Sequence, residues 1–124
     1  MELSELIAIH RDLAEKICQR LSADINKLGF TDDAIQQGPL YDDASYELIK
    51  DPFSGEQNLA CYWYNKTNKQ RIGRLQFNSD GSFYAEFDVV KEHPTKPKLF
   101  VEAVTAWGKA DVIKSEPKLL DIPQ

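Results

Sequence analysis

The chain contains few of the side chains from which catalytic and metal sites are usually built. Its 124 residues include two histidines, His10 and His93, and two cysteines, Cys18 and Cys61. The cysteines form no Cys-x-x-Cys pair and have no spacing typical of a zinc site. Phosphate-binding, dinucleotide-binding, nucleophile-elbow and zinc-protease motifs are also missing. We therefore expect a protein that is not an enzyme and that carries no cofactor and no metal ion.

Long hydrophobic runs are missing as well. No stretch approaches the roughly 18 apolar residues that a helix needs to cross a bilayer. The first residues include Glu2 and Glu5 instead of the basic residues that open a secretory signal peptide. These features predict a cytoplasmic protein with no membrane segment, in which Cys18 and Cys61 are reduced, unreactive thiols on apolar faces.

Basic charge is scarce in the first half of the chain. Residues 1–60 contain 12 acidic and 5 basic side chains, whereas residues 61–124 contain 8 acidic and 10 basic ones. The formal net charge is -5 and the sequence pI is about 5.0. An acidic protein repels nucleic acids and anionic membranes at long range, so we expect neither as a partner.

An amphipathic pattern predicts one long helix from Glu2 to Leu28. Apolar residues recur at spacings of three and four, with Gly29 placed to end the helix. The stripe consists of Leu3, Ile7, His10, Ala14, Ile17, Leu21, Ile25 and Leu28. We expect His10 to be a core or boundary residue of this helix, and His93 to belong to a turn before Pro94.

Alternating residues on both sides of Ser79-Asp80-Gly81 predict a β-hairpin over residues 71–88. Its register places Arg74 opposite Glu86. A preceding strand, residues 57–65, is expected to place Trp63 opposite Gly73, because this register buries the tryptophan and leaves Tyr62 on the other face.

The remaining elements complete an expected α+β fold of one domain, residues 1–124. Residues 44–49 predict a first strand and residues 110–114 a possible fifth one. Apolar residues spaced as in a helix over 97–107, between Pro97 and Gly108, predict a second, shorter helix, although the β-branched residues there also suit a strand. Both helices would cover one face of a four- to five-stranded antiparallel meander. Residues 115–124 would follow as a tail, or would dock on the body through Leu119, Leu120 and Ile122.

Such a sheet would leave its second face open, and this face is the main candidate for function. Tyrosines beside charged side chains are typical of protein-recognition surfaces, although they also occur on ordinary solvated sheets. The candidate partner-binding residues are Tyr62, Tyr64, Arg74, Tyr84 and Glu86. We expect a protein-interaction module of the immunity, adaptor or chaperone type. The acidic outer side of the long helix offers an alternative binding surface. The apolar stripe of the same helix offers a homodimer seam where it exceeds what one sheet covers.

The expected order of helix, meander and helix is similar to that of frataxin-like iron-binding proteins and of many small bacterial immunity and chaperone proteins. The similarity concerns element order and includes no shared motif. It implies an alternative function, a metal or small-molecule site near Asp42 and Asp43. A weaker alternative is binding of single-stranded nucleic acid through the basic hairpin Lys66–Arg74, where Lys66, Lys69, Arg71 and Arg74 lie near aromatic residues.

Overall fold

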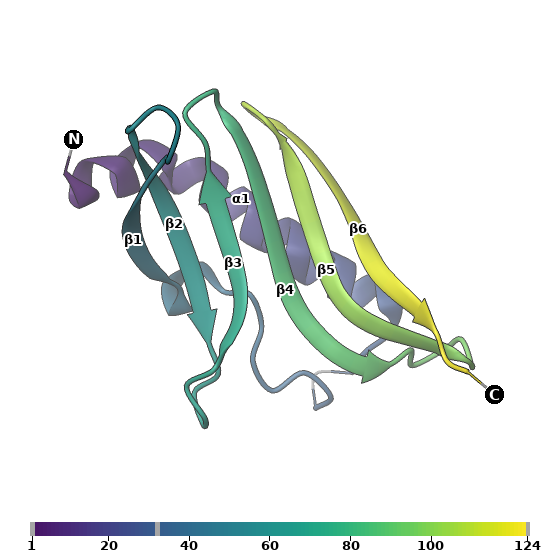
Figure 1. Ribbon diagram of the computed structural model, residues 1–124. Coiled ribbons are helices and arrows are strands. Elements are labelled where there is room, and N and C mark those ends of the chain that lie inside the picture. The colour runs from purple at the N-terminus through teal and green to yellow at the C-terminus, as the bar shows by residue number, and fades with distance from the viewer. Residues whose placement is uncertain (1, 32, 124) are drawn as a thin grey trace.

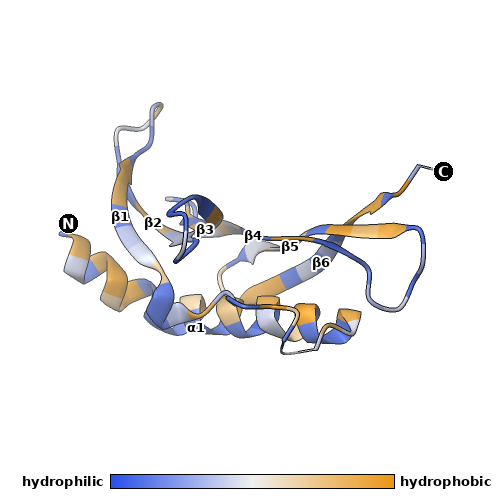
Figure 2. Cartoon of the chain, turned by 90° about the horizontal axis from the view of Figure 1, so that it is seen from below, coloured by the Kyte–Doolittle hydropathy of each residue, from blue (hydrophilic) through white to orange (hydrophobic). Residues whose placement is uncertain are grey.

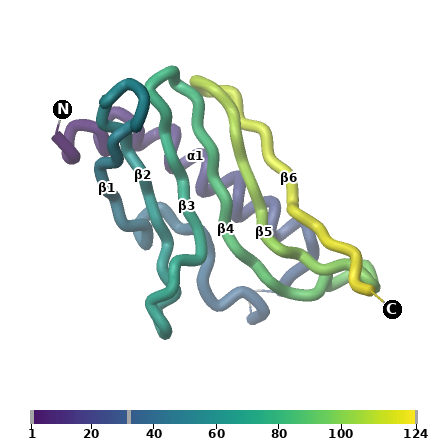
Figure 3. The backbone as a smooth tube through the Cα atoms, in the orientation of Figure 1, coloured from purple at the N-terminus to yellow at the C-terminus, as the bar shows by residue number. Residues whose placement is uncertain are grey.

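The computed structural model describes residues 2–31 and 33–123, and it contains one α-helix packed against one antiparallel sheet (Figure 1). The six strands lie in chain order, each beside the next, as the tube in Figure 3 also shows. The elements are α1 (Leu3–Leu28), a 3-10 turn η1 (Tyr41–Asp43), β1 (Ser45–Lys50), β2 (Gln57–Tyr64), β3 (Arg71–Phe77), β4 (Ser82–Glu92), β5 (Leu99–Lys109) and β6 (Val112–Asp121). The fold is α+β.

The predicted N-terminal helix is confirmed as α1. Glu2 caps it reciprocally with Glu5, and Gly29 ends it in the left-handed conformation at φ 103°. Ile17 and Leu21 are fully buried on its sheet-facing side. In Figure 2, α1 runs along one face of the sheet and the other face has no helix on it. One helix therefore covers the core from one side only.

The predicted strand registers are confirmed at the centre of the sheet. Trp63 lies opposite Gly73 in β2 and β3, and Arg74 lies opposite Glu86 in β3 and β4. Trp63 is 0% exposed. A Cβ added at Gly73 would lie 3.1 Å from the indole of Trp63, so the glycine makes room for this large ring. The tryptophan thus decides which face of β2 is the core face.

The expected second helix at 97–107 is wrong, because these residues form β5. Two features of this strand hide its alternation in the sequence. Val101 to Ala103 contains a β-bulge, which shifts the periodicity by one residue. Ala103, Val104, Thr105 and Ala106 are all buried, so apolar and small residues occur on both faces. The spacing of the apolar residues resembles that of a helix because this interior strand is buried on both faces.

The expected tail is also wrong over residues 115–121, because they belong to β6, which extends from Val112 to Asp121; the last residue of the expected tail lies outside the described residues. It pairs with β5 along most of its length through a tight turn at Ala110, whose φ is 55°. Glycine or asparagine usually occupies such a position, so the sequence gives no hairpin signal there. The described residues therefore form six strands and one α-helix, and they do not have the helix–meander–helix order on which the frataxin-like resemblance was based.

Polar side chains attach the long loop before β1 to the sheet. The indole Nε1 of Trp63 donates a hydrogen bond to the carbonyl of Leu40 at 2.9 Å. The amide of Gln37 donates to the carbonyl of Tyr64 at 2.7 Å and accepts from the backbone N–H of Lys66 at 3.1 Å. Gln37 thereby satisfies backbone groups at the end of β2.

Candidate protein-binding face

The sheet face turned away from α1 is called the open face here. Strand registers place its side chains in rows across the sheet. One row contains Glu47, Ala60, Gln76, Tyr84, Trp107 and Lys114, and the next contains Ser45, Tyr62, Arg74, Glu86, Thr105 and Glu116. Four of the predicted site residues, Tyr62, Arg74, Tyr84 and Glu86, belong to these two rows. The fifth, Tyr64, lies two residues after Tyr62 in β2, and the two rings are 6.4 Å apart. All five therefore lie on one continuous face.

Arg74, Tyr84 and Glu86 form a connected group at the centre of the open face. The guanidinium carbon of Arg74 lies 5.5 Å from the centre of the Tyr84 ring. The Tyr84 hydroxyl donates a 2.8 Å hydrogen bond to Oε2 of Glu86. The ammonium of Lys118 lies 4.0 Å from Oε1 of the same carboxylate. These contacts hold three predicted site residues in fixed positions, which lowers the entropy cost of binding.

A second cation–aromatic contact lies beside this group. The guanidinium carbon of Arg71 is 5.1 Å from the centre of the Tyr62 ring. Arg71, Arg74, Glu86 and Asp88 line a shallow hollow of about 240 Å³ together with the backbone of Gly73. The hollow thus has two guanidinium groups and two carboxylates on its walls.

Trp107 is an open-face residue that the sequence interpretation missed. It lies opposite Tyr84 on one side and Lys114 on the other, and its side chain is partly exposed. In the predicted helix it would have belonged to the buried stripe. Alternation from Thr105 to Trp107 within a strand would have placed it correctly, but the bulge and the buried small residues obscured that signal.

Small residues form the floor of the open face between the larger side chains. Ala60 is 1% exposed, Ala103 is 0% exposed and Thr105 is 6% exposed, although all three point away from the helix. The hydroxyl of Thr105 donates to the carbonyl of Glu116 at 3.1 Å. Water is therefore already excluded from part of this face, as it is at the centre of protein interfaces.

The electrostatic environment of the open face disfavours additional negative charge. Burial, followed by the nearby carboxylates of Glu86 and Glu102, raises the pKa of Asp88, and Lys118 and Arg71 counteract this only in part. Burial and the hydrogen bond to Glu86 also raise the pKa of Tyr84. A partner that brings a basic group to these carboxylates would relieve their mutual repulsion.

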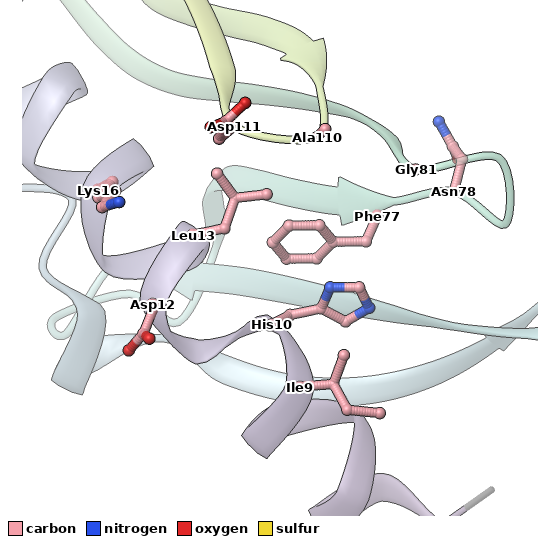
Figure 4. A pocket seen from close by; sticks show the side chains of 10 residues that line it. All are labelled: Ile9, His10, Asp12, Leu13, Lys16, Phe77, Asn78, Gly81, Ala110 and Asp111. Atoms are coloured by element: carbon pink, nitrogen blue, oxygen red, sulfur yellow. The ribbon is translucent and has the colours of Figure 1, made fainter.

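The histidines lie away from the open face. The His10 ring stacks on Phe77 under the sheet, with ring centres 4.3 Å apart and planes 11° apart. Figure 4 shows this pair in a hollow between α1 and the turns after β3 and β5, with Leu13 and Asp111 on its walls. Burial lowers the pKa of His10. Its expected boundary position on the helix is confirmed.

His93 organises a turn, as the sequence suggests. Its Nδ1 accepts hydrogen bonds from the backbone N–H groups of Thr95 and Lys96 at 3.1 and 3.0 Å. The turn joins β4 to β5 and therefore does not begin a helix at Pro97.

Both cysteines are free and buried in the core. Burial raises the pKa of each thiol to about 12, so both are protonated near neutral pH and poorly nucleophilic. Among residues 2–31 and 33–123, no group of three or more histidine, cysteine, aspartate or glutamate side chains is arranged to hold a metal ion. Asp43 of the predicted acidic pair lies 3.4 Å from the ammonium of Lys66.

In the basic hairpin Lys66–Arg74, which the sequence suggested as a nucleic-acid site, three of the cationic side chains make contacts within the protein. Lys66 pairs with Asp43, while Arg71 and Arg74 lie over tyrosine rings.

Within the described part of the chain, the helix is too polar to span a membrane. Comparisons with protein-family models, with curated protein sequences and with solved structures found no match to this chain.

Proposed function

We propose that the protein is a non-enzymatic interaction module, of the immunity, adaptor or chaperone type, that binds a protein partner through the open face. The observation that supports this most strongly is the connected group of Arg74, Tyr84 and Glu86 beside the partly exposed Trp107. Tyrosine, tryptophan and arginine dominate the binding energy of protein interfaces. Here they lie together on a face that no other described element covers.

The contacts within this face favour a protein partner over a small molecule. The hollow at Arg71 and Arg74 is shallow, whereas the aromatic residues are spread over three strands, β2, β4 and β5, if Trp107 is included. Side chains spread in this way over a sheet face match another protein surface better than a ligand enclosed in a cavity. The free thiols of Cys18 and Cys61 agree with a cytoplasmic location, which we include in the proposal.

The proposal is tested by capture from nuclease-treated lysate of the source cells, followed by an affinity measurement with the purified partner. Arg74→Glu combined with Tyr84→Ala is expected to weaken binding at least about 100-fold, because each removes a central contact worth at least about 1.4 kcal/mol. Lys27→Glu combined with Ile9→Ala is the matched control, since both residues are exposed on α1, on the other side of the sheet.

Two readouts keep this test independent of folding. The melting temperature of each variant identifies any that is destabilised, and Tyr84→Phe removes only the hydroxyl that bonds Glu86. Unchanged affinity in the Arg74 and Tyr84 variant would contradict the proposal. Equal loss in the control would point to the helix side instead.

A further inference from the structure

The two edges of the sheet differ in their protection against pairing with another strand. Edge strand β6 contains Pro117, which has no backbone N–H, and the exposed lysines Lys114 and Lys118. Proline and lysine are typical protective residues of edge strands. Edge strand β1 contains no proline and no register shift in its pairing with β2, and its one lysine, Lys50, is the last residue of the strand. Among the described residues, none of the backbone hydrogen bonds made outside the helix and sheet involves Ser45–Lys50.

The start of α1 provides a platform beside this unprotected edge. In Figures 1 and 2, the first turns of the helix project past β1, and the β1–β2 hairpin curls away from them. Leu3 and Ile7 belong to the same stripe as Ile17 and Leu21, yet they are only partly buried. The helix thus extends beyond the sheet that covers it.

From these observations we infer that β1 and the start of α1 form a docking site for an extended, basic segment of a partner protein. The segment would add a seventh strand beside β1, a common mode of peptide recognition. Its side chains on the helix side would be apolar, because Tyr46 and Leu48 are the neighbours in β1 and Leu3 and Ile7 lie below. This site is separate from the open face and goes beyond the proposed function.

Charge determines which side chains of the partner segment suit the open-face side of this edge. Glu47 is exposed on the open face at this edge, opposite Ala60. Glu2 and Glu5 lie at the exposed start of α1. A cation next to Glu47 would form a favourable cross-strand pair. Two antiparallel copies of β1 centred on Glu47 would instead place these two carboxylates opposite each other, so a second copy of this chain is the less suitable occupant.

The probe for this site is a capped heptapeptide of alternating lysine and valine, added to isotope-labelled protein. Its binding is expected to slow hydrogen exchange of alternate backbone amides in β1 and to leave those of β6 unchanged. The same peptide with glutamate in place of lysine is expected to bind at least about tenfold more weakly. Slowed exchange in β6, or none in either edge, would overturn the inference.

Backbone pairing is tested with two N-methylated forms of the peptide. The N–H groups of its lysines and of its valines point to opposite edges of an extended chain. Methylation of one set is therefore expected to weaken binding at least about tenfold and methylation of the other set to have little effect. Equal binding, or equal loss, would contradict the addition of a strand.

Matched variants locate the charge contribution. Glu47→Lys is expected to weaken peptide binding about fivefold, whereas Glu116→Lys, on the open face of the other edge strand, is expected to leave it unchanged. The Arg74→Glu and Tyr84→Ala variant should bind the peptide normally, which separates this site from the open face. Sedimentation velocity of the free protein should show a monomer, and a dimer with protected β1 amides would overturn the inference in favour of self-pairing.

Discussion

Tyr84 lies directly opposite Trp107 where β4 pairs with β5, on the side of the sheet away from α1. Arg74 approaches the tyrosine ring from β3, and Lys114 flanks the tryptophan from β6. Residues from four consecutive strands therefore meet at one place. This arrangement depends on β5 being a strand, since a helix at 97–107 would have removed Trp107 from the sheet.

The exposure of Trp107 can be tested by fluorescence quenching. The protein has two tryptophans, of which Trp63 is 0% exposed and Trp107 is partly exposed. We expect acrylamide to quench part of the emission of the native protein. Trp107→Phe should remove that part and leave an emission that is quenched severalfold less. Equal quenching before and after the substitution would contradict the position of Trp107 on the open face.

Substitution of Gly108 tests the β5–β6 hairpin. A Cβ at this position would overlap the carbonyl oxygen of Val112 and would lie 2.9 Å from the Phe83 ring. We expect Gly108→Ala to lower the free energy of unfolding by about 3 kcal/mol, measured by urea denaturation. Gly38→Ala is the control, because nothing lies within 4 Å of its Cβ position. A neutral effect at Gly108 would show that β6 is not held against β5 as described.

Removal of the Gln37 side chain tests how the long loop is attached. Gln37→Ala loses two hydrogen bonds to the end of β2, and we expect it to lower the free energy of unfolding by about 1 kcal/mol. Exposed Gln36 provides the matched control, and Gln36→Ala should change it by less than about 0.5 kcal/mol. Equal effects of the two substitutions would mean that the bonds of Gln37 contribute nothing specific.

His10 should make stability depend on pH. Burial against Phe77 lowers its pKa in the folded protein below the ordinary value of 6.5. The unfolded chain therefore binds the proton more readily than the folded protein does. The neutral His10 side chain contributes fully to the free energy of unfolding above pH 6.5, and this contribution is lost as pH falls through the folded pKa. We expect the difference in urea midpoint between wild type and His10→Phe to change in favour of the variant from pH 7.5 to pH 5. The same difference at both pH values would contradict this.

Much of the core was predictable because local signals agreed with one another. The stripe of α1 ends at Gly29, and the turn at Gly81 fixes the pairing of Arg74 with Glu86. These elements have the turn residues and periodicity that their structures require. Four of the strands and the positions of all five predicted site residues followed from such signals.

The segment that forms β5 and β6 was not predictable in the same way. Its turn uses Ala110 at positive φ, and its central strand has a bulge after Val101 and small residues on both faces. Tertiary pairing stabilises β5 and β6 where the local pattern favours a helix and a tail. Trp107 was missed for this reason, and with it one of the aromatic residues of the open face.

The position of a bound partner tests the central claim most directly. We would map hydrogen exchange of the protein, free and in complex with its captured partner, together with the quenching of Trp107. We expect Trp107 to become protected from quenching and hydrogen exchange to slow in β3, β4 and β5, while the outer side of α1 keeps its exchange rates. A footprint confined to α1, with Trp107 still quenched as in the free protein, would contradict it.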